Sequence, residues 1–408
     1  MKSLLNSPHV GILILAWLAA DLLIPLLIRA SRRAGLLDRP GGHKGHRQPI
    51  PFLGGVGVFI AFTLAVCSTL RFESGEGTLP LTGMLLCGAI VLVLGIIDDM
   101  RPMSAFIKLA VLIAASLLLV AFGVHVDLFP PILFNLPNVL LTLLWIGGVT
   151  SAANSLDNTD GVLGGTAAIA GIFVFLIAWG SSPADAQPGL SYLAVALVGA
   201  CLGFLRYNFP PARVYLGDNG AFFLGFLLAA MLVFGHYSHD PVKAALVPCL
   251  ILSVPLMDIT LVTLFRFRNG EVSSWEQAIL YCGRDHIAHL LMELCLSKRS
   301  AALVIYGFGF LGGGTALLVH GVESRWIYLP VTCLYLGILA GCGAILGRVH
   351  FHKAREQRGT EKRIHRGSPD PAGIPGAESP RTDYSGSAQE AGSAEEAVRS
   401  TVGGGSEH

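Results

Sequence analysis

Charged residues are scarce in this chain, since Asp, Glu, Lys and Arg together make up only 13% of its 408 residues. With 53% hydrophobic residues and a mean hydropathy of +0.63, this scarcity excludes an ordinary water-soluble globular protein. The formal net charge of +1 carries no information about partners by itself, and we expect no nucleic-acid partner.

Cysteine pairs with the spacing of metal ligands are absent as well. The eight cysteines include no CxxC pair, and most of them, such as Cys87 and Cys201, fall within or beside apolar segments. We interpret them as small apolar packing residues, so the sequence predicts no disulfide framework.

Apolar segments long enough to cross a bilayer as helices dominate the chain instead. Eleven are predicted, at roughly 8–28, 50–70, 82–97, 106–124, 137–153, 162–180, 190–206, 219–236, 243–265, 302–320 and 326–346. The sequence therefore predicts an all-α, polytopic membrane helix bundle.

Lysine and arginine indicate how these helices are oriented. If the N-terminus lies outside, 24 of the 28 basic residues fall in segments on the inner side, as the positive-inside rule requires. We expect the N-terminus outside and the C-terminus in the cytoplasm, as in a multi-pass protein of a cytoplasmic (inner) membrane. The predicted parts are a catalytic membrane domain over 1–346, a basic juxtamembrane segment over 347–366 and a disordered tail over 367–408.

Five aspartates at the ends of apolar segments are the most informative residues. They are Asp98, Asp99, Asp157, Asp160 and Asp218. An acid beside lipid is costly unless it is paired, hydrated or bound to a cation. Because the predicted topology puts all five on the cytoplasmic face, we infer a divalent metal and a phosphorylated substrate.

The first pair ends an apolar helix. Asp98 and Asp99 repel one another and lie near the unfavourable negative end of the helix dipole. Bound Mg²⁺ would relieve both problems, although an exposed turn at the water boundary is the alternative. Lys108, nine residues after Asp99, could hold a phosphate or could simply extend towards the headgroups.

The second group has polar side chains at i, i+3 and i+6. If the segment is helical, Asn154, Asp157 and Asp160 share one broad face. The Asn154 amide could ligate a metal, and the two acids could hydrogen-bond sugar or nucleobase groups. Helix termination would explain Asn, Asp and Gly at such a place equally well.

The third group precedes the helix predicted at 219–236. Asp218 should lie near its start, where N–H groups can also meet a phosphate, or where Asp218 could be a plain N-cap. Asn208 and Tyr215 come shortly before it. Tyr215 could stack on a flat base or anchor the chain at the interface.

The last candidates lie in predicted cytoplasmic loops. His286 and His289 fall on one helical face beside Arg284, which fits binding of phosphate or sugar better than a metal; an incidental surface pair is the alternative. Lys44 and His46 could cap the site, or could simply reflect topology.

In this order, these residues resemble the polyprenyl-phosphate N-acetylhexosamine-1-phosphate transferases, a family related to phospho-N-acetylmuramoyl-pentapeptide transferase. The resemblance spans residues 38 to about 300, and its motifs are specific as a set. The matching positions are Asp98-Asp99 with Lys108, Asn154, Asp157, Asp160-Gly161, Asn208, Gly217 to Gly220 with Leu224-Gly225, Asp285 to His289, and Lys44, His46 and Gly54-Gly55.

The sequence departs from the family's pattern at four positions. They are Asn158 for a usual glycine, Ala221 for a serine, Ala288 for a middle histidine and Leu290 for a frequent arginine. The histidine change, the eleven predicted helices and the cytoplasmic tail argue against the muramoyl-pentapeptide branch and favour the undecaprenyl-phosphate GlcNAc-1-phosphate transferase branch.

The resemblance implies a reaction. UDP-N-acetylhexosamine and undecaprenyl phosphate would give polyprenyl-diphospho-N-acetylhexosamine and UMP, the first membrane step of a cell-envelope glycan pathway. Mg²⁺, or alternatively Mn²⁺, would be the cofactor, and membrane lipid and a homodimer are the further expected partners.

The resemblance also implies roles for the residues. Asn154 and Asp218 would hold the metal, and Asp98, Asp99, Lys108 and His286 would be catalytic. The substrate-binding set would be Lys44, His46, Asp157, Asp160, Asn208, Tyr215, Arg284 and His289.

Two other classes of protein fit parts of the pattern. A secondary transporter with carboxylate ion sites would place some acids near the membrane midplane, whereas these five lie at segment ends. An intramembrane aspartyl protease needs two aspartates that share a proton within the hydrocarbon layer, which the basic loops do not require.

Overall fold

The structure is a computed structural model that describes residues 7–39, 48–69, 78–130, 135–180, 186–269 and 286–367, with side chains to residue 268 in the fifth range and to residue 351 in the last. Its helices are α2 (Pro8–Ala34), α3 (Gly54–Thr69), α4 (Thr78–Met100), α5 (Ala105–Ala121), α6 (Leu136–Leu156), α7 (Val162–Gly180), α8 (Pro188–Asn208), α9 (Gly217–Phe234), α10 (Pro241–Ile251), α11 (Ser253–Asn269), α13 (Ile287–Glu293), α14 (Lys298–Gly321) and α15 (Arg325–Gly367). A short antiparallel pair, β1 (Leu37–Asp38) and β2 (Ile50–Pro51), follows α2.

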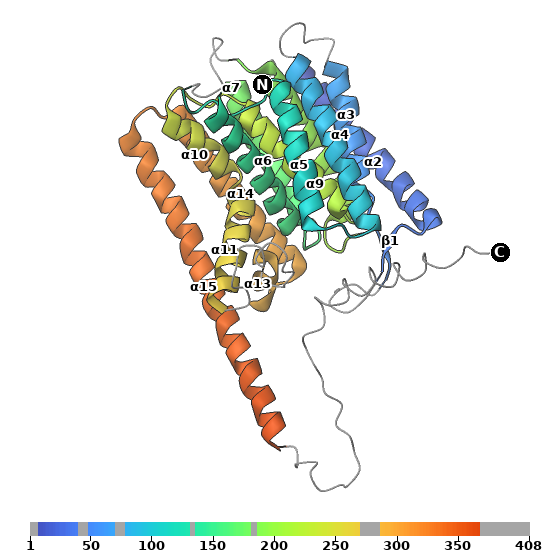
Figure 1. Cartoon of the computed structure of the whole chain (residues 1–408), viewed down its shortest axis with the longest axis vertical. Helices are drawn as coiled ribbons and strands as arrows, with labels where there is room; N and C mark the ends of the chain where they lie inside the picture. Colours follow the sequence, from blue (N-terminus) through green and yellow to red (C-terminus); the bar gives the residue numbers. More distant parts are fainter. Residues whose placement is uncertain are drawn as a thin grey trace, which may run out of the picture. The chain divides into compact units, whose positions relative to one another are not determined.

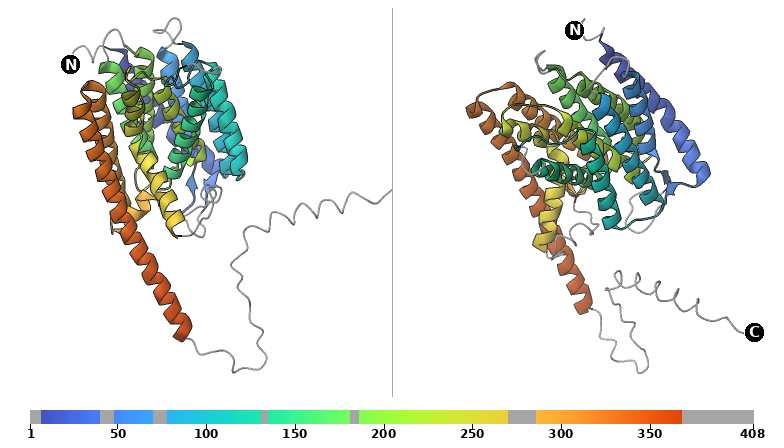
Figure 2. Two further views of the ribbon diagram at one scale, coloured as in Figure 1. Left: turned by 60° about the vertical axis from the view of Figure 1, so that its left-hand side comes forward. Right: turned by 45° about the horizontal axis from the view of Figure 1, so that its top comes forward.

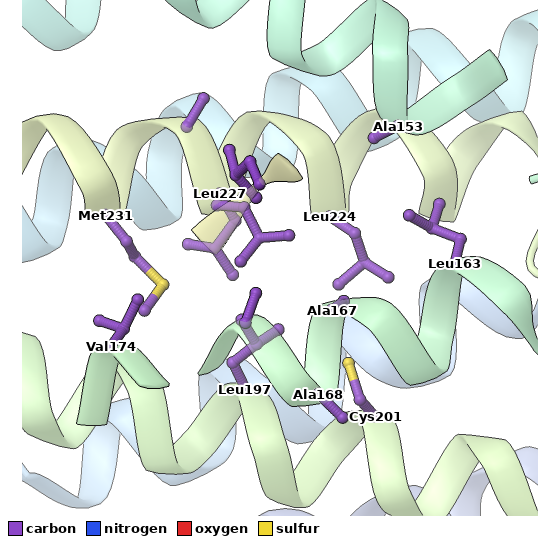
Figure 3. Close-up of a cluster of buried hydrophobic side chains, with 14 of the residues drawn as sticks. Ala153, Leu163, Ala167, Ala168, Val174, Leu197, Cys201, Leu224, Leu227 and Met231 are labelled. Carbon is purple, nitrogen blue, oxygen red and sulfur yellow. The ribbon is translucent and has the colours of Figure 1, made fainter. Parts of the chain in front are cut away.

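The helices from α2 to α9 pack side by side as one bundle (Figures 1 and 2). The interior is formed by α7, α8 and α9. In the most apolar 18-residue stretch of each of these helices, 78%, 83% and 78% is buried, compared with 22% for α2. Figure 3 shows Leu163 and Val174 of α7, Leu197 of α8 and Leu224 of α9 in this core. The outer helices expose apolar side chains, as helices surrounded by lipid do.

Membrane spans are confirmed as the main feature of the chain. Within the described ranges, eight helices are long and apolar enough to cross a membrane, and a ninth results if α10 and α11 count as one span. α3 and α5 are apolar but have only 16 and 17 residues, respectively. Each of the eleven predicted segments contains helix, but eleven crossings and their orientation stay a prediction.

The predicted single helix at 243–265 is wrong in one respect. It is broken at Leu252 into α10 and α11, which meet at 78°. Pro255 provides the reason, because proline lacks the N–H that a continuous helix would need there and its ring clashes with the carbonyl of residue 251. The break turns α11 and its Asp258 in a new direction.

Glycines let α3 and α4 approach α9 closely. A Cβ on Gly95 would lie 2.3 Å from the Asn219 Cα, and one on Gly55 would lie 2.2 Å from the Gly220 Cα. The N–H groups of Gly54 and Gly55 donate to the carbonyls of Tyr215 and Leu216 at 3.0 and 2.9 Å. The start of α9, where Asp218 lies, is therefore fixed by two neighbouring helices.

The interpretation of cysteines as packing residues is confirmed for Cys87 and Cys201, which are fully buried free thiols, whereas the free thiols of Cys67 and Cys249 are exposed. The chain divides into two compact units, Met1–His352 and Lys353–His408. Of the second unit, the structure describes only helix, up to Gly367. Residues 368–408 lie outside the described ranges, so the predicted three-part division stays a prediction.

Candidate active site

Asp99 fixes the N-terminus of α9. Its Oδ1 accepts a hydrogen bond from the Asp218 N–H at 2.9 Å, and its Oδ2 accepts from the Asn219 N–H at 3.0 Å and the Asn219 side chain at 2.7 Å. The first N–H groups of a helix have no partner within it and carry its positive dipole end, so a carboxylate suits them. Both oxygens of Asp99 are thereby engaged.

Asp98, next to it, is 4% exposed and forms the centre of a charged cluster. Its Oδ1 accepts from the Met103 N–H at 2.8 Å, and its Oδ2 lies 2.5 Å from the Lys108 Nζ. Its carboxyl group also lies within hydrogen-bonding reach of that of Asp218, which lies in the first turn of α9 as predicted. Two carboxyl groups in contact require a proton or a cation between them.

Asp157 and Asp160 lie in the turn that follows α6. Asp157 lies close enough to interact electrostatically with Asp218, Asp99 and Asp160; burial raises its pKa well above the usual range, and these three charges raise it further. Asp160 is 8% exposed, and its Oδ2 accepts from the Ala212 N–H at 3.2 Å. The structure therefore brings all five aspartates together at one end of the bundle.

Asn208 connects two loops of the site. Its Oδ1 accepts from the Gly161 N–H at 2.9 Å, and its Nδ2 donates to the Val214 carbonyl at 2.8 Å. Because its amide serves backbone groups and is 3% exposed, contact of Asn208 with a substrate stays a prediction. Tyr215 is half-buried near Asp160 and Asp157, and burial raises the pKa of its hydroxyl.

His286 is held by an acid that the motif analysis did not include. Its Nδ1 lies 2.9 Å from the Oδ2 of Asp258 on α11, and the Asp258 Oδ1 accepts from the Ile287 N–H at 2.7 Å. Asp258 is fully buried, and the hydroxyl of Ser155, which follows Asn154 on α6, lies 3.4 Å from the Asp258 Oδ2 and from the His286 Nδ1. His286 thus adjoins the end of the helix that carries Asn154.

α14 supports the same loops from its first turns. Lys298 Nζ lies 3.4 Å from Asp160 Oδ2, Arg299 Nε donates to the Pro210 carbonyl at 2.7 Å, and the Tyr306 hydroxyl donates to the Gly161 carbonyl at 2.6 Å. The sequence analysis counted Lys298 and Arg299 only as topology signals. Their partners lie nearly 90 residues or more away along the chain, so no local spacing indicates these contacts.

Of the two predicted metal ligands, Asp218 belongs to this cluster, and Asn154 lies on the last turn of α6, three residues before Asp157. Among the described residues, no three His, Cys, Asp or Glu side chains form a group that could hold a metal ion. The Asp98–Asp218 contact nevertheless fits a cation, and Asn154 is half-buried at the end of α6. Oxygen ligands of this kind suit Mg²⁺. The metal assignment stays a prediction.

Three predicted residues, Lys44, His46 and Arg284, lie outside the described ranges. His289 is half-buried on α13, one turn after His286.

Comparison with known proteins identifies the family. The profile of glycosyl transferase family 4 matches residues 81–236. A Bacillus subtilis (strain 168) protein, a probable undecaprenyl-phosphate N-acetylglucosaminyl 1-phosphate transferase, is 30% identical over 332 residues, which cover 80% of this chain and 88% of the relative. The chain belongs to this transferase family.

Other members of the family are also similar. The decaprenyl-phosphate N-acetylglucosaminephosphotransferase of Mycobacterium tuberculosis (strain H37Rv) is 29% identical, over 75% of this chain and 81% of its own. The undecaprenyl-phosphate alpha-N-acetylglucosaminyl 1-phosphate transferase of Escherichia coli (strain K12) is 25% identical, over 68% and 74%. The family profile includes all five aspartates but ends before Asp258 and the histidines.

The sequence of this chain contains a signal that indicates Asp258 as a functional residue. It lies inside an apolar segment, where an ionisable residue is a functional candidate by default. Asp258 was not predicted, because it lies well inside 243–265, which was expected to be one continuous span, and not at a segment end.

Proposed function

We propose that this chain transfers N-acetylglucosamine-1-phosphate from UDP-GlcNAc to undecaprenyl phosphate or a related polyprenyl phosphate. The observation that carries the proposal is the cluster of five aspartates with Lys108, assembled from α4, α5, α9 and the turn after α6 in a chain that belongs to this transferase family. A transporter finds no support among the relatives, which are named as transferases.

The reaction is a phosphoryl transfer. An oxygen of the lipid phosphate attacks the β-phosphorus of the nucleotide sugar, a new P–O bond forms, and the bond from this phosphorus to the bridging oxygen breaks, so UMP leaves with that oxygen. Such a reaction needs positioning and neutralisation of charge more than covalent chemistry. The protein must therefore bring two anionic substrates together.

Asn154 and Asp218 would hold Mg²⁺, with Mn²⁺ as the alternative. When bound, the metal would withdraw charge from the diphosphate. The close contact of the Asp98 and Asp218 carboxyl groups supports a cation there, because two negative charges in contact are otherwise unfavourable.

The remaining residues of the site would bind different parts of the two substrates. Lys108, already paired with Asp98, supplies positive charge for a phosphate oxygen. Asp98 would orient the lipid phosphate, and Asp99 contributes by fixing the start of α9. Asp157, Asp160 and Tyr215 would contact the uridine or the sugar.

His286 and His289 would lie near the sugar phosphate, together with Lys44, His46 and Arg284. Asp258 holds the Nδ1 side of His286, which leaves Nε2 as the nitrogen that can reach a substrate. Asp258 is in this account a positioning residue.

The site would face the cytoplasm of a bacterial inner membrane, because the basic residues lie on the same side as the aspartates. A homodimer fits this proposal but is not required by it.

A panel of donors tests the proposal. Purified protein is mixed with undecaprenyl phosphate, Mg²⁺ and UDP-GlcNAc, UDP-GalNAc or UDP-glucose, and UMP release is measured. We expect the highest rate with UDP-GlcNAc and no release without the lipid. Equal rates with and without polyprenyl phosphate would contradict the proposal, because they would indicate hydrolysis.

A further inference from the structure

We propose that a pocket lined by three arginines, beside the active site, binds the phosphate of an anionic phospholipid headgroup. The pocket has a volume of about 560 Å³. Arg29 and Arg32 line it from the last turns of α2, and Arg213 lines it from the loop after α8. We call it the arginine pocket.

No ion pair balances its charges within the part of the chain that the structure describes. The described residues include no ion pair for Arg29, Arg32 or Arg213, whereas nearby Arg206 lies 2.7 Å from a carboxylate oxygen of Asp21. Three guanidinium groups around one cavity repel one another, and an anion between them relieves the repulsion. Phosphate is the natural choice, since the guanidinium fork matches its oxygens.

The other wall of the pocket is apolar. Pro25, Ile28 and Ile50 line it, and on α2 Leu22 and Leu26 continue the same stripe with exposed fractions of 68% and 54%. These leucines lie in an apolar span, so they face acyl chains. An amphiphile with phosphate above apolar chains fits both walls, and basic pockets between membrane helices commonly bind such headgroups.

The pocket is separated from the carboxylate cluster by one strip of backbone. Ala212 lines the pocket, and its N–H donates to Asp160 Oδ2 at 3.2 Å. The Arg213 N–H donates to the Tyr207 carbonyl at 2.8 Å, and Tyr207 lines the pocket as well. A headgroup bound to Arg213 would therefore stabilise the segment that leads to Tyr215.

Two neighbouring arginines provide a matched test. Arg32 and Arg33 are both exposed on the last turn of α2, but only Arg32 lines the pocket. Arg32→Ala and Arg33→Ala remove the same charge at nearly the same depth. Binding of phosphatidylglycerol to each purified protein is measured by native mass spectrometry, with phosphatidylcholine as the neutral lipid, and thermal unfolding is recorded for both variants.

We expect Arg32→Ala and Arg213→Ala to weaken phosphatidylglycerol binding about tenfold or more, as loss of a hydrogen bond between charged groups does, while Arg33→Ala binds like the unchanged chain. An equal loss in Arg32→Ala and Arg33→Ala would overturn the proposal in favour of diffuse attraction to the surface. The readout is lipid binding, so it does not depend on the proposed transferase activity.

Two further measurements separate the sources of phosphate. We expect inorganic phosphate to displace phosphatidylglycerol only at far higher concentration, because it cannot use the apolar wall. Displacement at similar concentrations would overturn the lipid assignment. So would a result in which these variants lose undecaprenyl phosphate but retain phosphatidylglycerol, since the acceptor substrate would then be the occupant.

Discussion

Asp258 and His286, 28 residues apart in the sequence, form a buried pair in which the Asp258 Oδ2 lies 2.9 Å from the His286 Nδ1. The other oxygen of Asp258 accepts the N–H of Ile287, so one carboxylate fixes both the ring and the start of α13. A histidine held in this way presents its Nε2 in one direction.

A double-mutant cycle tests whether this pair acts as a unit. We expect Asp258→Ala and His286→Ala each to lower kcat/KM by about 10–100-fold, and the double variant to lose little more than either alone. Asp258→Asn keeps an acceptor for Ile287 and should retain the folded state. The measurement is UMP release, with thermal unfolding as the control. Multiplicative losses in the double variant would contradict the coupling.

Asp99 belongs to the Asp98-Asp99 motif, but we expect it to contribute to the stability of the protein. Because it accepts three hydrogen bonds at the start of α9, Asp99→Ala should destabilise the protein by about 1–2 kcal/mol, the usual effect of removing a helix cap. Thermal unfolding in detergent measures this. An unfolding temperature like that of the unchanged chain, together with lost activity, would make Asp99 a substrate contact instead.

Two glycine substitutions should differ in their effect on stability. Gly95→Ala places a Cβ 2.3 Å from the Asn219 Cα, so α4 must move away from α9, at about 1–3 kcal/mol. Gly147→Ala, inside α6, meets no atom within 4 Å and should be neutral or stabilising by up to about 1 kcal/mol. Unfolding temperatures of both variants give the comparison; a tolerated Gly95→Ala would contradict the close approach.

Removal of divalent metal should stop the reaction. We expect EDTA to abolish UMP release and Mg²⁺ or Mn²⁺ to restore it, because the carboxylate cluster would otherwise repel the diphosphate. Asp218→Asn should raise the Mg²⁺ concentration needed for half-maximal rate by about tenfold or more. Normal Mg²⁺ dependence in this variant would remove Asp218 from the metal site.

The sequence predicted the parts of the site that depend on local pattern. Acids beside apolar segments and basic residues in loops are visible without a structure, and they led to Asp98, Asp157 and Asp218. Lys108 was identified as well, as a residue that holds a phosphate or extends towards the headgroups, but its ion pair with Asp98 was not predicted.

The contacts that join distant segments could not be anticipated in this way. Tyr306 reaches Gly161 and Lys298 reaches Asp160 across more than 130 residues, and only the packing of α14 against α7 brings them together. The break at Leu252 is a local effect of Pro255. Hydropathy alone does not indicate it, because the segment is apolar on both sides of the break.

The fate of the β-phosphorus tests the central claim most directly. Purified protein is given UDP-GlcNAc labelled at the β-phosphorus, together with undecaprenyl phosphate and Mg²⁺, and the label is followed into lipid and nucleotide. If sugar-1-phosphate is transferred, the label moves to the lipid and the nucleotide released is unlabelled UMP. Label recovered in released UDP would contradict the account, because it would show that the sugar alone had been transferred.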